Sequence, residues 1–397
     1  MERMQKQKGQ VMQPVTMAVL IAVVILSELP SFSALINSSS LSAIPEKPVS
    51  RLAADTMDKT YKLLPSNFVK IPERYPWYES QSIRYIRCDE PLCIDVHEST
   101  THKCKNTELC YYEISYHDEA TSKGLLVTDT FALHLKGGSP ISPTLAIGSS
   151  TYYSSKGRLN SQSTTHGMLG LGKGKISILS QLHKQGNFAN IFGHCLSSNP
   201  GVSGGVSGFM FIGKDFDYPR CLTWVPMSSD VSHYSLTTAE VIYGDHEQSL
   251  LGRNQAFVLD SGTTDTYFLD PMYQELLTKV TKTTLQKAPG DGKHPICWKD
   301  TRPFTSILDL KNRFSSIYLR LQNGKALEIP AENYLIITEA GYACLGIFNS
   351  GDIELSFNLI GAISMQNVTI VYDNERQQIG WARVAGCSQP PVGICTS

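Results

Sequence analysis

The residues with the most evident chemistry lie in the string FVLDSGTTDTYF, where Asp260 follows an apolar run. That run predicts a buried strand, and a carboxylate at the end of such a strand is held rigidly. Gly262 allows the backbone to turn tightly, and the hydroxyls of Ser261 and Thr263 can bond the carboxylate or neighbouring backbone. Asp260 held in this way could act as a general base toward water.

The alternative is an ordinary turn, because Asp, Ser and Gly are also common turn residues. The flanking pattern favours the functional interpretation. A strand is predicted over residues 255–259, and a helix begins within ten residues of the motif, with Asp270 as N-cap and Pro271 as first helical residue. The predicted apolar face of this helix consists of Tyr273, Leu276, Leu277 and Val280.

The remaining pattern is mainly β with few helices. A long hairpin is predicted from strands at 111–116 and 125–135 with a polar turn between them. A two-residue type I′ turn at Asn323-Gly324 is predicted to join strands at 317–321 and 326–329. A further strand is predicted at 208–212, and a second helix from Ser177 to Lys184 that ends at Gly186.

Composition restricts the classes of function. The chain has 397 residues, which predicts two lobes, and its 35 Lys and Arg balance 36 Asp and Glu. A chain with this balance has no overall positive electrostatic field that would attract nucleic acid or an anionic membrane. Any binding partner must therefore be recognised at a local site. Ten cysteines fit an oxidising compartment, and none forms a CxxC pair or a Cys/His cluster with zinc spacing. No metal or cofactor is therefore expected.

The beginning of the chain has the pattern of an export signal. Three basic residues precede an apolar run over 17–26, and the small residues Ser31 and Ser33 follow. The run is short for a bilayer span, which predicts a cleaved leader; the alternative is an uncleaved signal anchor. Asn37 and Asn367 begin glycosylation sequons, a pattern that also occurs by chance.

Several strings besides the aspartate motif resemble the nucellin-like subgroup of plant pepsin-like aspartic proteases. The resemblance covers about residues 85 to 390 and implies a mainly β, bilobal pepsin-like fold, a peptide or protein substrate and a monomer. That family has a D-[ST]-G-[ST] motif in each lobe, each followed later by an apolar-apolar-Gly strand. The matching strings are YYEISYHDEATSKGLLVTD, HGMLGLGKGKISILSQL, NIFGHCL, PICWKD, ENYLII, ACLGIFN and VYDNERQQIGWA.

The resemblance implies a role for each matching residue. Asp260 would be the second catalytic aspartate, Gly262 and Thr263 would lie beside substrate, and Ser261 would clasp backbone between the lobes. Tyr116 would be the tyrosine of the flap hairpin; the alternative is an ordinary strand tyrosine. The glycines packed behind the two aspartates would be Gly170 and Gly361.

The resemblance also implies two disulfides, although the sequence alone does not fix connectivity. They would join Cys195 to Cys387 and Cys297 to Cys344. Cys221 and Cys395 match no expected position, so they either pair with each other or remain free. The cysteines from Cys104 to Cys110 are expected to lack the partners that the family's insert supplies.

The first-lobe motif of the family has no match upstream of Cys88. Asp55-Thr56-Met57 lacks the glycine and a preceding apolar strand, and Asp129-Thr130-Phe131 lies within the strand that returns from the flap. His166 and Ala362 also stand where the family commonly has Asp. The sequence therefore predicts a pepsin-like fold with an incomplete N-terminal lobe.

The predicted organisation is a signal peptide over 1–33, a linker or disordered arm over 34–80, a truncated N-terminal lobe over 81–225 and a C-terminal lobe over 226–397. The implied function is aspartic-type endopeptidase in the secretory pathway, extracellular, in the cell wall or in the vacuole, with no lasting membrane anchor. Because aspartic proteolysis uses two carboxylates, one motif predicts impaired activity. The alternatives are a non-catalytic peptide- or protein-binding relative, a partial gene product, and a homodimer that brings two Asp260 motifs together.

Overall fold

The computed structural model describes residues 69–70, 80–97, 108–115, 121–131, 133–135, 141–154, 169–197, 208–214, 222–229, 233–244, 250–384 and 386–387. The predicted leader and most of the predicted linker lie outside these ranges. Within them, no helix is both long and apolar enough to cross a bilayer.

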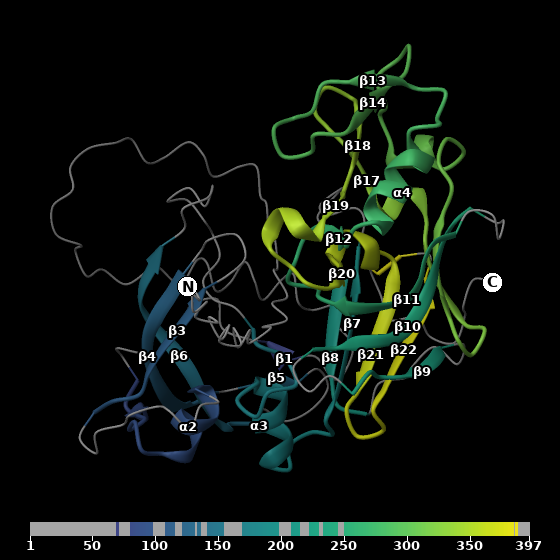
Figure 1. The fold of residues 1–397 in the computed structure, drawn as a ribbon. Coiled ribbons are helices and arrows are strands. Elements are labelled where there is room, and N and C mark those ends of the chain that lie inside the picture. The colour runs from purple at the N-terminus through teal and green to yellow at the C-terminus, as the bar shows by residue number, and fades with distance from the viewer. Residues whose placement is uncertain are drawn as a thin grey trace, which may run out of the picture.

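The N-terminal part is built on a four-stranded sheet in which β4 (Thr121–Thr130) pairs with β2 (Arg84–Tyr85), β3 (Tyr111–Ser115) and β6 (Thr144–Ser154) (Figure 1). Helix α2 (Pro91–His97) contributes to the apolar cluster of this sheet through Cys93. A separate two-stranded sheet joins β1 (Val69–Lys70) to β5 (His134–Leu135).

The predicted hairpin is present, but β4 begins four residues earlier than its apolar pattern suggests and ends at Thr130. Residues 121–124 are polar, yet their backbone pairs with β3 on one side and β6 on the other, as at Ser122 opposite Ile114 and Tyr153. Ladder hydrogen bonds come from the backbone, so pairing on both sides extends the strand through side chains that favour a turn.

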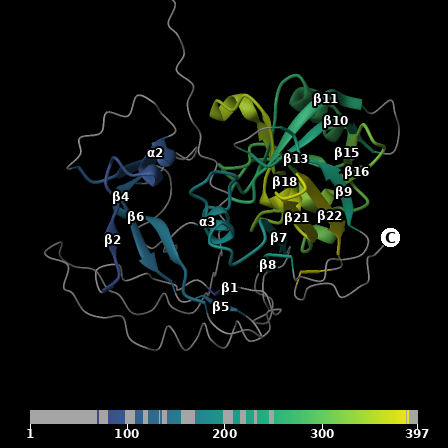
Figure 2. The same ribbon diagram turned by 90° about the horizontal axis from the view of Figure 1, so that it is seen from below.

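A five-stranded sheet connects the two halves of the chain. Its strands, in order, are β8 (Gly208–Ile212), β7 (Ile191–Leu196), β21 (Val368–Asp373), β22 (Gln378–Arg383) and β9 (Thr223–Pro226). Strand β21 is buried along its whole length and pairs with β7 from Thr369 opposite Cys195 to Asp373 opposite Ile191. Figure 2 shows α3 (Ile178–Lys184) beside β7, between this sheet and the N-terminal one.

Helix α3 forms where the sequence predicts it. The Ser177 side chain accepts a hydrogen bond from the backbone N–H of Ser180, and Gly186 adopts a φ of 74° after the last turn. Both features are local signals for helix ends, which explains why they can be read from the sequence.

The C-terminal lobe contains a seven-stranded and a four-stranded sheet (Figure 1). The larger has the order β16 (Ala326–Ile329), β15 (Ile317–Leu321), β10 (Ser235–Tyr243), β11 (Leu250–Leu259), β20 (Asn358–Ile360), β12 (Thr266–Phe268), β19 (Ile347–Asn349). The smaller has the order β13 (Gln286–Ala288), β14 (Cys297–Lys299), β18 (Ala343–Leu345), β17 (Leu335–Ile337). Short 3₁₀ helices lie between strands: η4 (Ile307–Leu310) follows β14, η5 (Ala331–Asn333) follows β16, η6 (Ser350–Ile353) follows β19, and η7 (Ala362–Met365) lies between β20 and β21.

The predicted helix after the motif is α4 (Met272–Val280), but its N-terminus differs from the prediction. Pro271 occupies the N-cap position, and Asp270 does not cap the helix. The Asp270 carboxylate instead accepts a 2.9 Å hydrogen bond from the Asn349 side chain, so a long-range partner replaces the local one. The predicted apolar face is present, because Tyr273 and Val280 are buried together with Leu276.

The Asn323-Gly324 turn joins the predicted strands, but it is not a two-residue type I′ loop. Leu321 accepts a hydrogen bond from the Gly324 N–H and donates its own N–H to Lys325, which makes the loop three residues long. Only Gly324 has a positive φ, of 77°. A type I turn followed by a left-handed glycine satisfies the same sequence signal.

The structure contains the two disulfides implied by the resemblance, Cys195–Cys387 and Cys297–Cys344. A third joins Cys93 to Cys110, so the expectation that Cys110 has lost its partner is wrong. The α2 residue Cys93 supplies that partner instead of an insert. Cys104, Cys221 and Cys395 lie outside the described residues.

Candidate active site around Asp260

Asp260 directly follows the central strand β11. Its N–H donates a 3.0 Å hydrogen bond to the Ile360 carbonyl, which extends the parallel pairing of Leu259 with Ile360. Phe257 and Leu259 are buried beneath it, and the Asp260 residue itself is 8% exposed. The strand prediction is therefore confirmed, and the strand delivers a carboxylate to a fixed point at the edge of the lobe's core.

Each carboxylate oxygen of Asp260 has a donor within its own turn. The Gly262 N–H donates to Oδ1 at 2.9 Å, and the Thr263 hydroxyl donates to Oδ2 at 2.6 Å. Charge-assisted bonds of this kind are short and orient a carboxylate strongly. Gly262 and Thr263 thus fix the direction in which Asp260 presents its oxygens.

The role of Ser261 as a hydroxyl that clasps backbone between the lobes stays a prediction. The residue is 6% exposed, and its buried hydroxyl oxygen has no hydrogen-bond partner among the described residues. A buried hydroxyl is normally bonded, so this one needs an explanation. The resemblance implies that this hydroxyl clasps backbone between the lobes, and the sequence has no match to the first-lobe motif.

Gly361 packs directly behind the turn. A Cβ at this position would overlap the carbonyl oxygen of Asp265 and crowd that of Thr263, so glycine is required by space. The next residues also hold the turn: Ala362 N–H donates to the Thr263 carbonyl at 2.7 Å, and Ile363 N–H donates to the Thr264 carbonyl at 3.0 Å.

Gly170 lies in the other half of the chain in an equivalent order of elements. Its carbonyl accepts a 3.1 Å hydrogen bond from Ile178 N–H at the start of α3, and β7 and β8 follow. Gly361 likewise precedes η7, β21 and β22, and β7 pairs with β21. The two halves therefore repeat a glycine, a short helix and two strands.

Other predicted positions are placed as follows. Tyr116, His166, Asp55 and Asn37 lie outside the described residues. Asn367 is half-buried, with a φ of 55°. Asp129 is fully buried within β4, where its carboxylate accepts hydrogen bonds from the Ser82 hydroxyl and from Thr130 N–H.

Comparison with known proteins decides the family. Models described as Xylanase inhibitor N-terminal and Xylanase inhibitor C-terminal match residues 65–214 and 245–383. An aspartic proteinase of Oryza sativa subsp. japonica is 33% identical over 322 residues, covering 77% of this chain and 76% of that protein. The chain belongs to the plant pepsin-like aspartic protease family. Its place in the nucellin-like subgroup stays a prediction.

Other members and structures agree with this assignment. Aspartic proteinase 39 of Arabidopsis thaliana is 28% identical over 315 residues, covering 76% of this chain and 62% of that protein. Basic 7S globulin from soybean has the same fold, with a TM-score of 0.62 at 18% identity, covering 82% of this chain and 89% of that one. An aspartic proteinase from Irpex lacteus has a TM-score of 0.54 at 16% identity, covering 70% and 82%. These structures show the pepsin-like fold.

The sequence analysis did not identify a buried tyrosine near the Asp260 site of this protein. Tyr372 in β21 is fully buried and stacks on Phe192 with ring centroids 4.5 Å apart. Burial raises the pKa of Tyr372 well above its ordinary value, and the charges of Tyr234 and Asp260 add to the shift. Tyr372 therefore lies within electrostatic reach of Asp260 and stays a neutral phenol. Its string VYDNERQQIGWA matches the family but gave no chemical signal.

A second missed feature is the acidic residue inside the motif string. Asp265 is 4% exposed and faces Lys293 and His294, which lie almost thirty residues further along the chain. In the sequence Asp265 is an acidic residue between two threonines, which by itself does not identify a partner.

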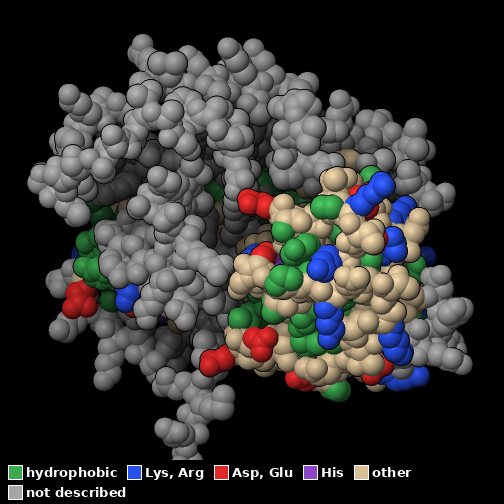
Figure 3. Space-filling model, turned by 90° about the horizontal axis from the view of Figure 1, so that it is seen from above, with side chains coloured by type: hydrophobic (Ala, Val, Ile, Leu, Met, Phe, Trp, Pro, Cys, Tyr) green, Lys and Arg blue, Asp and Glu red, His purple; other side chains and the backbone are tan. Residues whose placement is uncertain are grey.

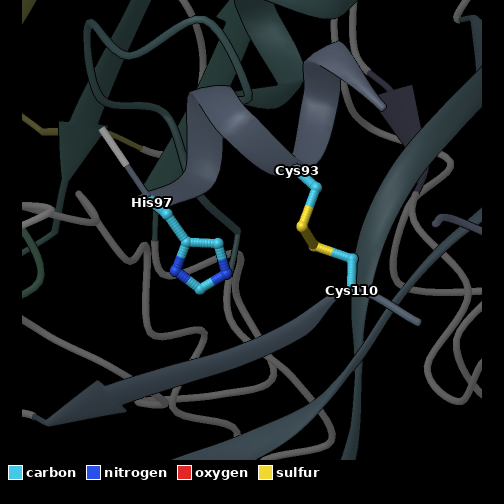
Figure 4. Close-up of side chains that lie close together, drawn as sticks. All are labelled: Cys93, His97 and Cys110. Carbon is cyan, nitrogen blue, oxygen red and sulfur yellow. A yellow bond between two sulfur atoms is a disulfide. The ribbon is translucent and has the colours of Figure 1, made fainter. Parts of the chain in front are cut away.

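Cys93, His97 and Cys110 are the described residues that gather with spacing suitable for a metal (Figure 4). The two sulfur atoms are bonded to each other, so neither is a thiolate ligand. His97 Nε2 lies 2.8 Å from the Tyr111 carbonyl.

On the face shown in Figure 3, basic and acidic side chains both occur among the described residues, in keeping with a net charge of −1.

Proposed function

We propose that this chain is an aspartic-type endopeptidase of the secretory pathway with impaired hydrolytic activity, and that Asp260 is its catalytic carboxylate. The observation that carries the proposal is the Asp260 turn, in which a strand-end carboxylate is buried and each oxygen is held by one donor. The family membership supplies the substrate class, which is a peptide or protein chain.

The expected impairment follows from the chemistry of the reaction. An ionised carboxylate takes a proton from water while a protonated one donates a hydrogen bond to the substrate carbonyl, so two carboxyl groups share the work. The sequence contains one Asp-Ser-Gly-Thr string and no second Asp-Ser-Gly or Asp-Thr-Gly. Asp129 is a poor substitute, because it is an internal residue of a β-strand that bonds Ser82 and its own neighbour.

A second candidate function is binding of a peptide or protein without cleavage. The family models that match this chain are described as xylanase inhibitor, a name for proteins that bind an enzyme. In this interpretation an extended peptide segment contacts Gly262, Thr263 and the proposed flap residue Tyr116. The protein then keeps the fold but does not hydrolyse the bound peptide.

Export is part of the proposal. The predicted leader over residues 1–33 would direct the chain into the secretory pathway, and three disulfides among the described residues fit an oxidising compartment. Cell wall, vacuole and extracellular space all meet that requirement.

The test combines binding and cleavage with matched variants. Purified protein is incubated with a denatured protein substrate at about pH 4, where a carboxylate pair is half-protonated, and thermal stabilisation by pepstatin is measured in parallel. Asp260→Asn removes the proposed carboxylate, and Glu339→Gln changes an exposed carboxylate away from the turn.

Slow cleavage that Asp260→Asn abolishes and Glu339→Gln preserves supports the impaired peptidase. Pepstatin binding without cleavage favours the binding function. Cleavage that persists unchanged in Asp260→Asn contradicts the role given to this aspartate.

A further inference from the structure

A buried histidine lies between two carboxylates close to the Asp260 turn. His294 Nδ1 is 3.1 Å from Asp291 Oδ2, and His294 Nε2 is 3.8 Å from Asp265 Oδ1. The His294 side chain is 6% exposed and that of Asp265 is 5% exposed. Both ring nitrogens therefore face acidic groups, and the ring has little access to water.

This geometry decides the charge of the ring. Ionised carboxylates only accept hydrogen bonds, so Nδ1 must carry a hydrogen to bond Asp291. In a neutral ring the lone pair of Nε2 would then face the carboxylate of Asp265. In the part of the chain that the structure describes, neither His294 Nε2 nor Asp265 Oδ1 has another hydrogen-bond partner. An imidazolium presents an N–H to each carboxylate and removes this repulsion.

Lys293 adds a second cation to the same carboxylate. Its Nζ lies 3.0 Å from Asp265 Oδ2, while His294 faces Asp265 Oδ1. Two adjacent residues of one loop therefore lie opposite the two oxygens of Asp265. The charged groups facing His294 are Asp265 from the turn before β12, and Asp291 and Lys293 from its own loop. From β19 the described contact is the uncharged ring of Phe348, with centroids 5.7 Å apart.

The loop that carries these cations is itself fixed. Asp291 Oδ1 accepts backbone hydrogen bonds from Lys293 at 2.9 Å and His294 at 2.6 Å. Cys297, three residues after His294, is tied to Cys344 by a disulfide. The loop can therefore act as a rigid support for the Asp265 carboxylate that it contacts.

Asp265 connects this support to the candidate active site. It is the fifth residue after Asp260, and its carbonyl packs against Gly361. The following residue, Thr266, donates its N–H to the Gly346 carbonyl at 3.1 Å, and its hydroxyl accepts the N–H of Gly361 at 3.1 Å. Segment 263–266 is thus held by 361–363 through its backbone and by the loop 291–294 through the Asp265 side chain.

We propose that His294 is a positioning residue for the Asp260 turn: as an imidazolium it clamps Asp265, together with Lys293, to the loop 291–294. The proposal rests on the proposed function only in that the clamped turn carries Asp260. Its readouts are charge and local stability, so they are independent of whether the protein cleaves peptides.

The clamp has a defined pH range. Asp265 raises the pKa of His294 above 6.5, because its attraction together with that of Asp291 outweighs burial. Stabilisation from His294 is therefore complete below pH 6.5 and is lost as pH rises through the higher folded pKa. Burial raises the pKa of Asp265, but His294 and Lys293 outweigh it, so its pKa lies below 3.8. The Asp265 contribution is present above pH 3.8 and is lost as pH falls through the lower folded value.

The first test measures the charge of His294 in the unmodified protein. Ring ¹⁵N spectra are recorded across a pH series, and His294→Gln identifies the signal by its absence. A histidine with an ordinary pKa is about one tenth protonated at about pH 7.5, whereas the clamp predicts a larger protonated fraction for His294 at that pH. A His294 ring that is protonated no more than an ordinary histidine across the series would overturn the proposal, and this result does not depend on whether any variant folds.

The second test measures the effect on the turn. Hydrogen exchange of peptides spanning residues 260–266 is compared in wild type, His294→Gln and the matched control His183→Gln, a half-exposed histidine at the end of α3. Near pH 6, His294→Gln is expected to raise exchange in these peptides by about tenfold or more while His183→Gln does not. The difference must shrink as pH rises past the folded pKa of His294. A difference that is constant with pH shows a packing role only and contradicts the clamp.

Asp265→Asn supplies a variant that keeps the histidine. It must lower the pKa of His294 in the ring ¹⁵N titration, because the facing carboxylate becomes a neutral amide. An unchanged His294 titration in this variant would refute the pairing of the two residues.

Discussion

Substitution of Gly361 by alanine tests whether the Asp260 turn is held from behind as described. The added Cβ would overlap the Asp265 carbonyl oxygen and crowd the Thr263 carbonyl, and both contacts are with backbone, which cannot rotate away. Either segment 263–265 or the start of η7 must move.

The expected cost has two parts. Overpacking in a rigid site costs about 1–3 kcal/mol. Displacement also weakens the hydrogen bonds from Ala362 to Thr263 and from Ile363 to Thr264, each contributing about 0.5–1.5 kcal/mol. The sum is a loss of about 2–6 kcal/mol, which is a large part of the stability of a typical domain.

The assay is urea unfolding of the disulfide-intact protein followed by tryptophan fluorescence. The matched control is Gly174→Ala, where the added Cβ has nothing within 4 Å and the glycine is exposed. Gly174→Ala is expected to lie within about 0.5 kcal/mol of wild type. If Gly361→Ala also lies within that range, the close packing behind Asp260 is not real and the reasoning fails.

Three further predictions concern the support of the fold. Burial lowers the pKa of His194 to about 4, so its stabilising effect is present above pH 6.5 and is lost as pH falls toward 4. His194→Gln should remove up to about 3 kcal/mol of that pH dependence, measured as the change in free energy of unfolding between about pH 4 and pH 7; an unchanged dependence would contradict the neutral buried ring. Gly324→Ala, at a φ of 77° in open space, should cost about 1 kcal/mol in urea unfolding, and no cost would argue against the left-handed turn residue. The double substitution Cys297→Ala and Cys344→Ala removes a disulfide that closes a loop with a sequence separation of 47, and it should lower the free energy of unfolding by about 4 kcal/mol. A decrease of less than about 1 kcal/mol would contradict this prediction.

Local features of the fold could be predicted from the sequence because their causes are local. The apolar run before Asp260 became β11, and Ser177 and Gly186 delimit α3 as expected. Predictions failed where a distant partner decided the outcome. Residues 121–124 joined β4 because strands pair on both sides, and Asp270 bonded Asn349 instead of capping α4.

In the candidate site, too, local contacts could be predicted from the sequence and contacts between distant segments could not. Hydrogen bonds from Gly262 and Thr263 to Asp260 lie within one turn, so residue types and spacing indicate them. The contact of Asp265 with His294 joins distant segments, and no periodicity or motif points to it. The Cys93–Cys110 pairing was missed for a related reason, since cysteine spacing does not determine connectivity.

The most direct measurement is kcat/KM for a peptide substrate at about pH 4 in wild type and Asp260→Asn. Enzymes typically reach about 10⁴–10⁸ M⁻¹s⁻¹, and loss of one acid–base partner costs about 10²–10⁴-fold. We predict a wild-type value below that range that falls to background in Asp260→Asn. A wild-type value within the range, or one that Asp260→Asn leaves unchanged, would contradict the account.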